Sequence, residues 1–586
     1  MIKLIKQFNK KDWTLIITST ILIFLQVWLE LKMPDYMSAI TRLVQTEGSK
    51  MSDIIRNGGY MLVCAAGSLL SAVVVGYLIS LLSSGFSCNL RKKIFDKVEN
   101  LSMNEVKNFQ TNSLITRTTN DITQVEMLLS MGLQLLIKAP ITAVWAITKI
   151  LNKSWQWSMV TLIAVLILLS VIGILIALVM PKFKIVQKLT DKINGVVREN
   201  LMGIRVVRAF NAEEYQENKF ENVNSALTNQ QLYNQKKFAI MSPVMYMVMN
   251  MLTLAIYFIG ANLIDSAMMV DKISLFGDMV VFSSYAMQII MSFLMLAMIF
   301  MILPRAEVSI SRINEVLDTD ITIKDGKGNI NKTETGTVEF KNVSFKYPDA
   351  EEYLLKNISF KAEKGKTVAF IGSTGSGKST LINLIPRFYD VTEGEVLVDG
   401  VNVKEYKLED LYNILGYIPQ KAVMFDGTVE SNVAYGDSKN KKTKEDILKA
   451  IEVAQAKEFV SKMDDKELSH IAQGGTNVSG GQKQRLSIAR AIAKNPEIYI
   501  FDDSFSALDY KTDSVLRKEL KKYTKDATNL IVAQRIGTIM NADLIIVLDN
   551  GVCVGKGTHK ELLENCEVYK EIALSQLSKE ELENGN

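Results

Sequence analysis

The sequence predicts an α-helical membrane domain of six transmembrane helices, fused to an α/β domain. Two observations predict this division. Residues 1–304 contain six apolar runs of about 20 residues, the length that crosses a bilayer as a helix. From Gly336 onward, short strands rich in Val and Ile alternate with helical stretches, as in α/β domains.

The membrane part is assigned to residues 1–304 because six such runs are not found in the cores of soluble proteins. The long intervals 84–126 and 181–238 are charged and have apolar residues three or four apart, which predicts helices that continue the spans outside the membrane. A polar linker is expected over 305–335, and the second domain over 336–586. The expected spans lie at about 13–33, 58–83, 127–151, 155–180, 239–263 and 276–303.

Composition excludes several other classes of protein. With 67 Lys and Arg against 63 Asp and Glu, the net charge of +4 argues against a nucleic-acid partner. Four scattered cysteines without a CxxC motif argue against a zinc cluster or a disulfide framework. With only two histidines, a histidine-based metal site or catalytic triad is not expected.

The second domain contains a glycine-rich motif near its start. It follows the apolar run TVAFI and precedes a helical run, the context in which such a loop wraps a phosphate with its backbone N–H groups. Lys378 is expected to reach the β- and γ-phosphates of ATP and Ser379 to bind Mg²⁺. Asp502, which ends the strand IYIFD, is expected to hold the same ion. The motif consists of Gly372, Ser373, Thr374, Gly375, Ser376, Gly377, Lys378 and Ser379.

The need for ATP fixes the predicted topology. ATP is a cytoplasmic nucleotide, so the second domain is expected in the cytoplasm. Six spans then return the chain to the side on which it began, and the long charged intervals become cytoplasmic extensions of the helices. The sequence therefore predicts a multi-pass protein of the cell membrane with ATP and Mg²⁺ as cofactors.

A third motif reveals a family resemblance. Residues 477–485 read NVSGGQKQR and lie between the glycine-rich loop and Asp502. With six spans before one such domain, the whole chain resembles half of an ATP-binding cassette (ABC) exporter. The resemblance implies a transport-coupled ATPase that works as a dimer. It also implies that Ser479, Gly480, Gly481 and Gln482 cap the γ-phosphate of ATP held by the opposite subunit.

The resemblance assigns further residues. Tyr347 would stack on adenine, and Thr380 would join the phosphate-binding loop. Gln420 would touch Mg²⁺ and sense the membrane domain, while Asp509, in the sequence SALD, would lie on the loop that crosses to the partner. Segments near 108–117 and 210–217 resemble the coupling helices of such exporters.

Two departures from the family pattern affect hydrolysis. Asp503 stands where the family has the glutamate that polarises the attacking water, and Gln534 stands where it has a histidine on the γ-phosphate. Gln473 is a milder change from glutamate. The pattern resembles the degenerate-site subunit of a heterodimeric exporter. Its non-identical partner would supply the glutamate and the histidine, and a homodimer would leave both sites without them.

The substrate is the least defined expectation. Methionines of spans 5 and 6, such as Met241 and Met291, suit a permissive apolar cavity or fill gaps between helices. Lys138 in span 3 is expected to face the cavity or a partner, and Glu30 to extend toward the membrane surface. We expect the protein to export amphipathic drugs or related compounds, with membrane lipid as a further partner. A lipid, peptide or siderophore transporter, an importer, and a regulatory ATP-binding subunit remain alternatives.

Overall fold

The computed structural model describes residues 7–46, 48–151, 154–328, 332–436 and 442–576. The chain divides into two compact units. The first comprises Met1–Glu99 and Asn112–Asp318, and the second comprises Asn100–Thr111 and Thr319–Asn586.

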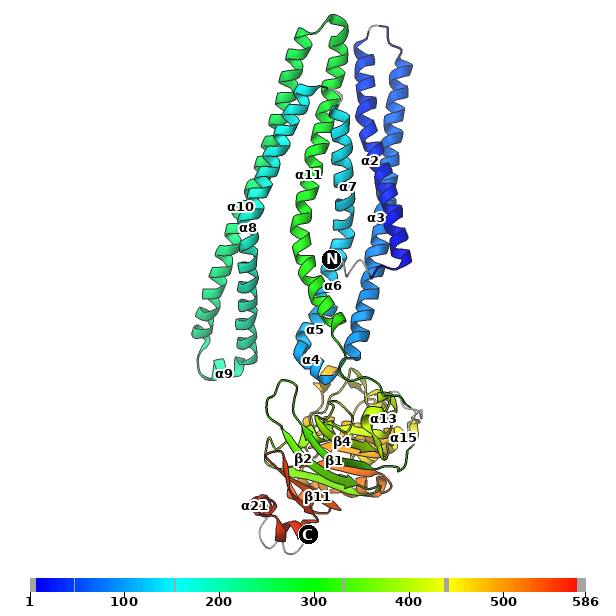
Figure 1. The fold of residues 1–586 in the computed structure, drawn as a ribbon, viewed down its shortest axis with the longest axis vertical. Helices are drawn as coiled ribbons and strands as arrows, with labels where there is room; N and C mark the ends of the chain where they lie inside the picture. The colour runs from blue at the N-terminus through cyan, green and yellow to red at the C-terminus, as the bar shows by residue number, and fades with distance from the viewer. Residues whose placement is uncertain (1–6, 47, 152–153, 329–331, 437–441, 577–586) are drawn as a thin grey trace. The chain divides into compact units, whose positions relative to one another are not determined.

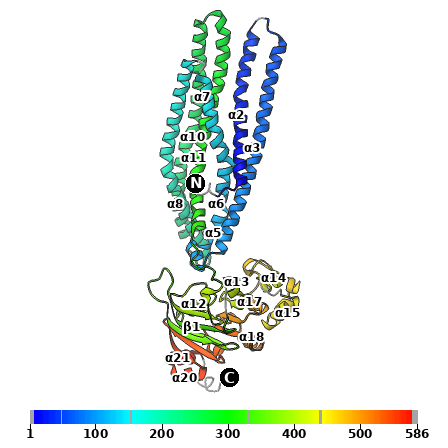
Figure 2. The same cartoon turned by 45° about the vertical axis from the view of Figure 1, so that its right-hand side comes forward.

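The first unit is built of long helices (Figure 1), and within the described residues six are long and apolar enough to cross a membrane. Helices α2 and α3 run side by side, as do α8 and α10 (Figure 2). The helices extend well past the apolar runs, as α8 does when it continues from Trp155 to Met202, so the extensions predicted from the charged intervals are present. The bounds are α2 Lys10–Gln45, α3 Met51–Glu99, α5 Thr111–Thr118, α6 Asn120–Met127, a π-helical turn Leu128–Gly132, α7 Leu133–Leu151, α8 Trp155–Met202, α9 Ile204–Ala209, α10 Glu213–Ser266 and α11 Met269–Asp318.

Ion pairs join α2 to its neighbours inside the first unit. Lys138 Nζ on α7 lies 3.0 Å from Glu30 Oε1 on α2, which also accepts from Gln26 at 2.9 Å. Lys149 lies 2.8 Å from Asp35. Lys138 therefore has a carboxylate partner within the chain, and Glu30 is not a solitary charge reaching for the membrane surface. Pairing of this kind lowers the cost of placing either charge among apolar helices.

The segment 305–335 begins as helix. Helix α11 runs to Asp318 because Ala306, Ile310, Ile313 and Val316 are buried on one face at helical spacing. The first part of the polar linker expected over 305–335 is therefore the end of α11, and the helix ends at Asp318.

The second unit holds two main sheets. The six-stranded sheet has the order β12-β11-β3-β10-β9-β6 and is parallel except for β12. The four-stranded sheet, β2-β1-β4-β5, is antiparallel, and β7 pairs with β8. The strands are β1 Val338–Phe345, β2 Leu355–Ala362, β3 Thr367–Gly372, β4 Glu393–Val398, β5 Val401–Asn402, β6 Leu415–Ile418, β7 Gly427–Thr428, β8 His470–Ile471, β9 Ile498–Asp502, β10 Thr528–Val532, β11 Leu544–Asp549 and β12 Val552–Gly557.

Short helices surround these sheets. They are α4 Met103–Phe109, α12 Lys378–Asn383, α13 Leu408–Ile414, α14 Val429–Val433, α15 Lys444–Val453, α16 Lys457–Ser461, α17 Gly480–Lys494, α18 Tyr510–Tyr523, α19 Ile536–Ile539, α20 His559–Asn565 and α21 Glu567–Gln576. Three 3-10 turns lie at Val403–Glu405, Lys466–Leu468 and Gln473–Gly475.

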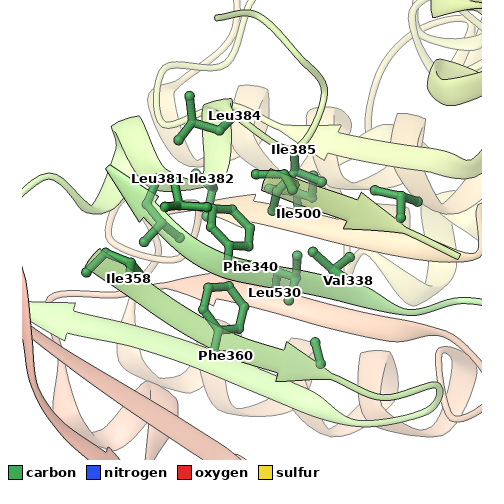
Figure 3. Close-up of a cluster of buried hydrophobic side chains, with 14 of the residues drawn as sticks. Val338, Phe340, Ile358, Phe360, Leu381, Ile382, Leu384, Ile385, Ile500 and Leu530 are labelled. Atoms are coloured by element: carbon green, nitrogen blue, oxygen red, sulfur yellow. The ribbon is translucent and has the colours of Figure 1, made fainter. Parts of the chain in front are cut away.

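A buried cluster fixes the first turns of α12 against the sheets (Figure 3). Phe340 on β1 stacks on Phe360 on β2 with ring centroids 4.6 Å apart. Leu381 and Ile382 of α12 are fully buried in the same cluster. Burial of these apolar side chains holds the start of α12, and with it the loop before α12, in one place.

Candidate nucleotide-binding site

The glycine-rich loop joins the central strand β3 to helix α12. Gly377 has a φ of 94° and precedes Lys378, the first residue of the helix. A Cβ at Gly372 would overlap the carbonyl oxygen of Leu548 on the neighbouring strand. Glycine is thus required at both ends of the loop, one for backbone conformation and one for close approach.

Lys378 is folded into the loop. Its ammonium group donates to the carbonyl oxygens of Gly372 at 2.9 Å and Ser373 at 2.7 Å, and to Ser376 Oγ at 3.3 Å. Burial lowers the pKa of Lys378, although Asp503 and Asp502 oppose this effect. A phosphate group entering the loop would replace carbonyl acceptors with a full negative charge, a stronger partner for this ammonium group.

Asp502 and Ser379 form the expected metal-binding pair. Ser379 Oγ donates to Asp502 Oδ1 at 2.7 Å. Asp502 is buried, and burial together with the neighbouring charge of Asp503 raises its pKa despite the Ser379 hydrogen bond. A hydroxyl and a buried carboxylate are ligands that Mg²⁺ accepts, and a cation there would neutralise the two adjacent carboxylates. These residues therefore fit the ion implied by the glycine-rich loop.

Two glutamines converge on Asp503. Gln534 Nε2 donates to Asp503 Oδ2 at 2.8 Å, and Gln420 Nε2 lies 3.3 Å from the same oxygen. The three side chains come together because β6, β9 and β10 are parallel neighbours. Gln420, Asp503 and Gln534 follow the carboxyl ends of these strands, which lie at one edge of the sheet. Burial raises the pKa of Asp503, while the Gln420 hydrogen bond lowers it.

Tyr347 lies in an aromatic group near the loop. Its hydroxyl is 2.9 Å from Thr380 Oγ1, and its ring packs edge-on against Phe345 and Tyr389. The Lys107 ammonium group lies 5.5 Å from the centre of the Tyr347 ring. Nitrogen and ring at this distance attract each other, and a base stacked on that face would take the place of Lys107.

Comparison with known proteins identifies the chain. The profile of the ABC transporter transmembrane region matches residues 15–293, and that of the ABC transporter ATP-binding part matches residues 355–506. An uncharacterized ABC transporter ATP-binding protein of Mycobacterium tuberculosis is 40% identical over 92% of this chain and 93% of its own length. This protein is an ABC transporter.

Other relatives of this ABC transporter bear more specific names. A protein of Pseudomonas aeruginosa named ATP-dependent lipid A-core flippase is 32% identical over 86% of this chain and 82% of its own length. The solved structure of a bacterial Atm1-family ABC exporter with ATP bound superimposes with a TM-score of 0.82 at 22% identity, covering 97% of this chain and 99% of that one. This similarity shows that the ABC transporter has the exporter fold.

Membership of the family settles the general activity and location. The ABC transporter is a multi-pass membrane protein whose ATP-binding domain lies in the cytoplasm, and ATP is its cofactor. The ATP-binding domain makes the chain an ATPase coupled to transport. Half-transporters of this kind act as dimers.

The SGGQ segment of the ABC transporter faces outward from its own domain. Ser479 caps helix α17: its hydroxyl accepts from Gln482 N at 3.3 Å, and Gln482 Oε1 accepts from Ser479 N at 2.8 Å. Ser479 and Gly480 are exposed, and a Cβ at Gly480 would meet no atom within 4 Å. In the described part of the chain, no hydrogen bond links this segment to the glycine-rich loop.

Asp509 serves as a helix cap. Its Oδ1 accepts from Thr512 N at 2.9 Å at the start of α18, and this bond lowers its pKa. The described structure gives Asp509 a local role in shaping the loop Ser506–Asp509. Its predicted contact with a partner subunit stays a prediction.

Two short helices lie near the segment 108–117 that resembles a coupling helix. Helix α5, Thr111–Thr118, overlaps this segment, and α4, Met103–Phe109, precedes it and belongs to the second unit, so the coupling role stays a prediction. Glu105 Oε2 accepts from Ser102 N at 2.6 Å, and Glu105 Oε1 accepts from Thr322 Oγ1 at 2.7 Å. The sequence carried a usable signal, because Ser102-x-x-Glu105 is a capping box that marks a helix start. The other segment, 210–217, joins α9 to the start of α10, and its coupling role stays a prediction as well.

Proposed function

We propose that this chain is one half of a heterodimeric exporter whose own ATP site binds ATP but hydrolyses it poorly. Support comes from Asp503, whose Oδ2 accepts hydrogen bonds from Gln534 and Gln420. An amide neither gains nor loses a proton at neutral pH, so this group of three lacks the histidine that family members place on the γ-phosphate. Aspartate is also one methylene shorter than glutamate, and a misplacement of about 1 Å costs on the order of 100-fold in rate.

The residues that hold ATP are intact in this proposal. Lys378, Ser379 and Asp502 contact one another or the glycine-rich loop as ATP and Mg²⁺ binding requires. We assign Gln420 to the metal site as well, where it would help Ser379 and Asp502 to hold Mg²⁺. Adenine stacking falls to Tyr347, beside Thr380.

The exposed segment Ser479–Gln482 would complete the second ATP site. Its outward position in this chain leaves it free to cap the γ-phosphate of ATP held by a non-identical half-transporter. That partner would carry the glutamate and the histidine that this chain lacks. Hydrolysis would then occur mainly at the shared site, with Asp509 on the connecting loop.

Purifying the chain alone tests the heterodimer. In lipid nanodiscs, the chain should retain ATP but turn it over at less than about a tenth of the rate of its Asp503→Glu/Gln534→His variant. Turnover of the wild-type chain equal to that variant would show that Asp503 and Gln534 suffice, and a homodimeric pump would replace the proposal.

Substitution in the assembled pair tests which residues serve the active site. Ser479→Arg should abolish most ATPase activity, because a large cation would occupy the γ-phosphate position of the competent site. Asp503→Asn should reduce activity only modestly. The reverse ranking would contradict the assignment of Ser479–Gln482 to the hydrolysing site.

For the substrate, we propose amphipathic compounds, with drugs as the first class and lipids as the second. Lipids are favoured by the similarity to proteins named lipid A-core flippases. Substrate-stimulated ATPase activity of the assembled pair, measured across both classes, separates these candidates.

A further inference from the structure

A cavity of about 600 Å³ lies within the membrane unit between α8, α10 and α11. In Figure 1, the α8–α10 pair diverges from α11 toward the end that carries α9. The wall from α8 is apolar up to Val186 and ends at Gln187, with Ile172, Leu175, Val179 and Phe183 three or four residues apart on one helical face. From α10 come Phe238 and Met241, and the Phe238 and Phe183 rings are 6.3 Å apart.

The α11 side of the same cavity is basic. Arg305 and Arg312 both line it, and they lie two turns apart on one face of the helix, about 10 Å along its axis. Both are exposed, and neither guanidinium group has a hydrogen bond or ion pair within the described part of the chain. Among the described residues that line the cavity, none is Asp or Glu.

Two carboxylates near the cavity contact residues other than Arg305 and Arg312. Glu315, the nearest acidic residue after Arg312 on α11, lies 2.8 Å from Arg117. Arg117 also donates to the main-chain oxygen of Arg312 at 2.8 Å, which fixes the helix where the Arg312 side chain emerges. Asp121 accepts from Ser309, another lining residue, at 2.7 Å. Within the described residues, no carboxylate pairs with Arg305 or Arg312, and Glu307, two residues after Arg305, does not line the cavity.

The position of these charges matches the edge of the membrane. Arg305 and Arg312 follow the last apolar run, 276–303, on its cytoplasmic side, whereas Ile172–Met180 belong to the apolar run of α8. A ligand that fills the cavity would therefore place an apolar body among α8 and α10 and its polar end beside α11. Anionic head groups of the cytoplasmic leaflet lie at this same depth.

We propose that this cavity binds an anionic amphiphile, with its apolar part against α8 and α10 and its acidic group between Arg305 and Arg312. The proposal deepens the proposed function and rests on it only in treating the cavity as the place where an exporter receives its substrate. Arginine forms paired hydrogen bonds with carboxylate and phosphate oxygens, so an acidic head group is favoured over a zwitterionic or neutral one.

The test measures binding without ATP. The full chain in neutral detergent is titrated with 11-(dansylamino)undecanoic acid and with its methyl ester, which share an apolar part and differ in charge. Wild type should bind the acid at least ten-fold more tightly than the ester. Arg305→Gln/Arg312→Gln should lose this preference while keeping its affinity for the ester, and Arg305→Lys/Arg312→Lys should keep part of it.

A matched pair of arginines serves as the control. Arg205→Gln/Arg208→Gln removes two exposed charges from α9, outside the cavity lining, and should leave both affinities unchanged. Equal binding of acid and ester by wild type would overturn the proposal, as would an unchanged preference in Arg305→Gln/Arg312→Gln. Absence of binding of either probe would also overturn it, because helices of a second chain would then fill the cavity.

Competition identifies the source of the ligand. Displacement of the acid by phosphatidylglycerol but not by phosphatidylcholine would support an anionic lipid. Displacement by deoxycholate alone would support a soluble anionic amphiphile. Because no step of this assay uses ATP, its failure would leave the degenerate ATP site untouched, and a high ATPase rate of the chain alone would leave this cavity untouched.

Discussion

Gln534 donates a hydrogen bond of 2.8 Å to Asp503 Oδ2, across 31 residues of sequence. The two residues on which the proposed degenerate site depends are therefore in direct contact. They form one unit together with Gln420. Their effects on hydrolysis should depend on each other.

Restoring both residues should raise hydrolysis by the chain alone. We predict that Asp503→Glu/Gln534→His increases ATP turnover at least ten-fold, because the longer carboxylate reaches the water and the imidazole carries a proton. Each single change should recover much less, because residues that act as a unit are not additive. The measurement is phosphate release in lipid nanodiscs.

Lys378→Ala provides the control for that gain. Added to the restored chain, it should abolish turnover, because the β- and γ-phosphates lose their cation. Turnover that stays at the wild-type level in the restored chain would mean that another part of the molecule limits hydrolysis.

The buried carboxylate of Asp502 should reduce the stability of the nucleotide-free protein. Its pKa is raised by burial, so the folded state binds a proton more readily than the unfolded state. Stability therefore falls as pH rises through this range, and the full loss is present above the folded pKa. We predict that Asp502→Asn has a higher Tm than wild type at pH 8, and that the difference shrinks as the pH is lowered through the raised pKa.

Mg²⁺ and ATP should reverse that ranking. Wild type gains Tm when both are added, since the ion neutralises Asp502, whereas Asp502→Asn gains much less. Thermal unfolding at several pH values, with and without Mg²⁺ and ATP, provides the measurement. A variant that is less stable than wild type at pH 8 without nucleotide would contradict the prediction.

The Glu30–Lys138 ion pair should stabilise the membrane unit. Lys138→Met leaves Glu30 unpaired among helices, and we expect a loss on the order of 2 kcal/mol. The double variant Glu30→Gln/Lys138→Met should recover most of it, because Gln26 and Ser68 still donate to the oxygen at position 30. The measurement is the thermal unfolding of the chain in detergent.

An exposed pair offers a matched control. Arg56 and Asp53 lie 3.2 Å apart on the same helix with exposed side chains, so Arg56→Met should change stability little. A loss equal to that of Lys138→Met would show that the location of the charge has no role. Failure of the double variant to recover stability would show that Lys138 acts through packing and not through its charge.

The division into membrane helices and an α/β domain was predictable because both signals are local. An apolar run of bilayer length and the loop Gly372–Ser379 can each be recognised from a stretch of about 30 residues. The sequence did not predict the full length of α11, because residues 305–335 are mostly polar. Ile310 and Ile313 are buried only because neighbouring helices cover them. The same limit hid the partner of Lys138, because Glu30 lies 108 residues away.

The sequence indicates which residues are candidates for the site, but not the contacts among them. Asp502 ends β9, and Asp503 and Gln534 follow β9 and β10, whose parallel pairing joins segments far apart in the sequence. No sequence pattern predicts the hydrogen bond from Gln420 to Asp503 or the position of Lys107 over the Tyr347 ring. Arg305 and Arg312 likewise read as ordinary surface charges until α8 and α10 supply the apolar wall opposite them.

Tyr347 provides the last prediction, which concerns how the site holds the base. Its ring is fixed by Phe345, Tyr389 and a hydroxyl bond to Thr380, so it offers a rigid surface to adenine. We predict that Tyr347→Ala weakens ATP binding about ten-fold, the loss of roughly one aromatic stacking interaction. Tyr347→Phe should stay within about two-fold of wild type, because it keeps the ring and loses only the hydroxyl. Titration with a fluorescent ATP analogue measures both, and equal losses in the two variants would assign the effect to the Thr380 bond and not to stacking.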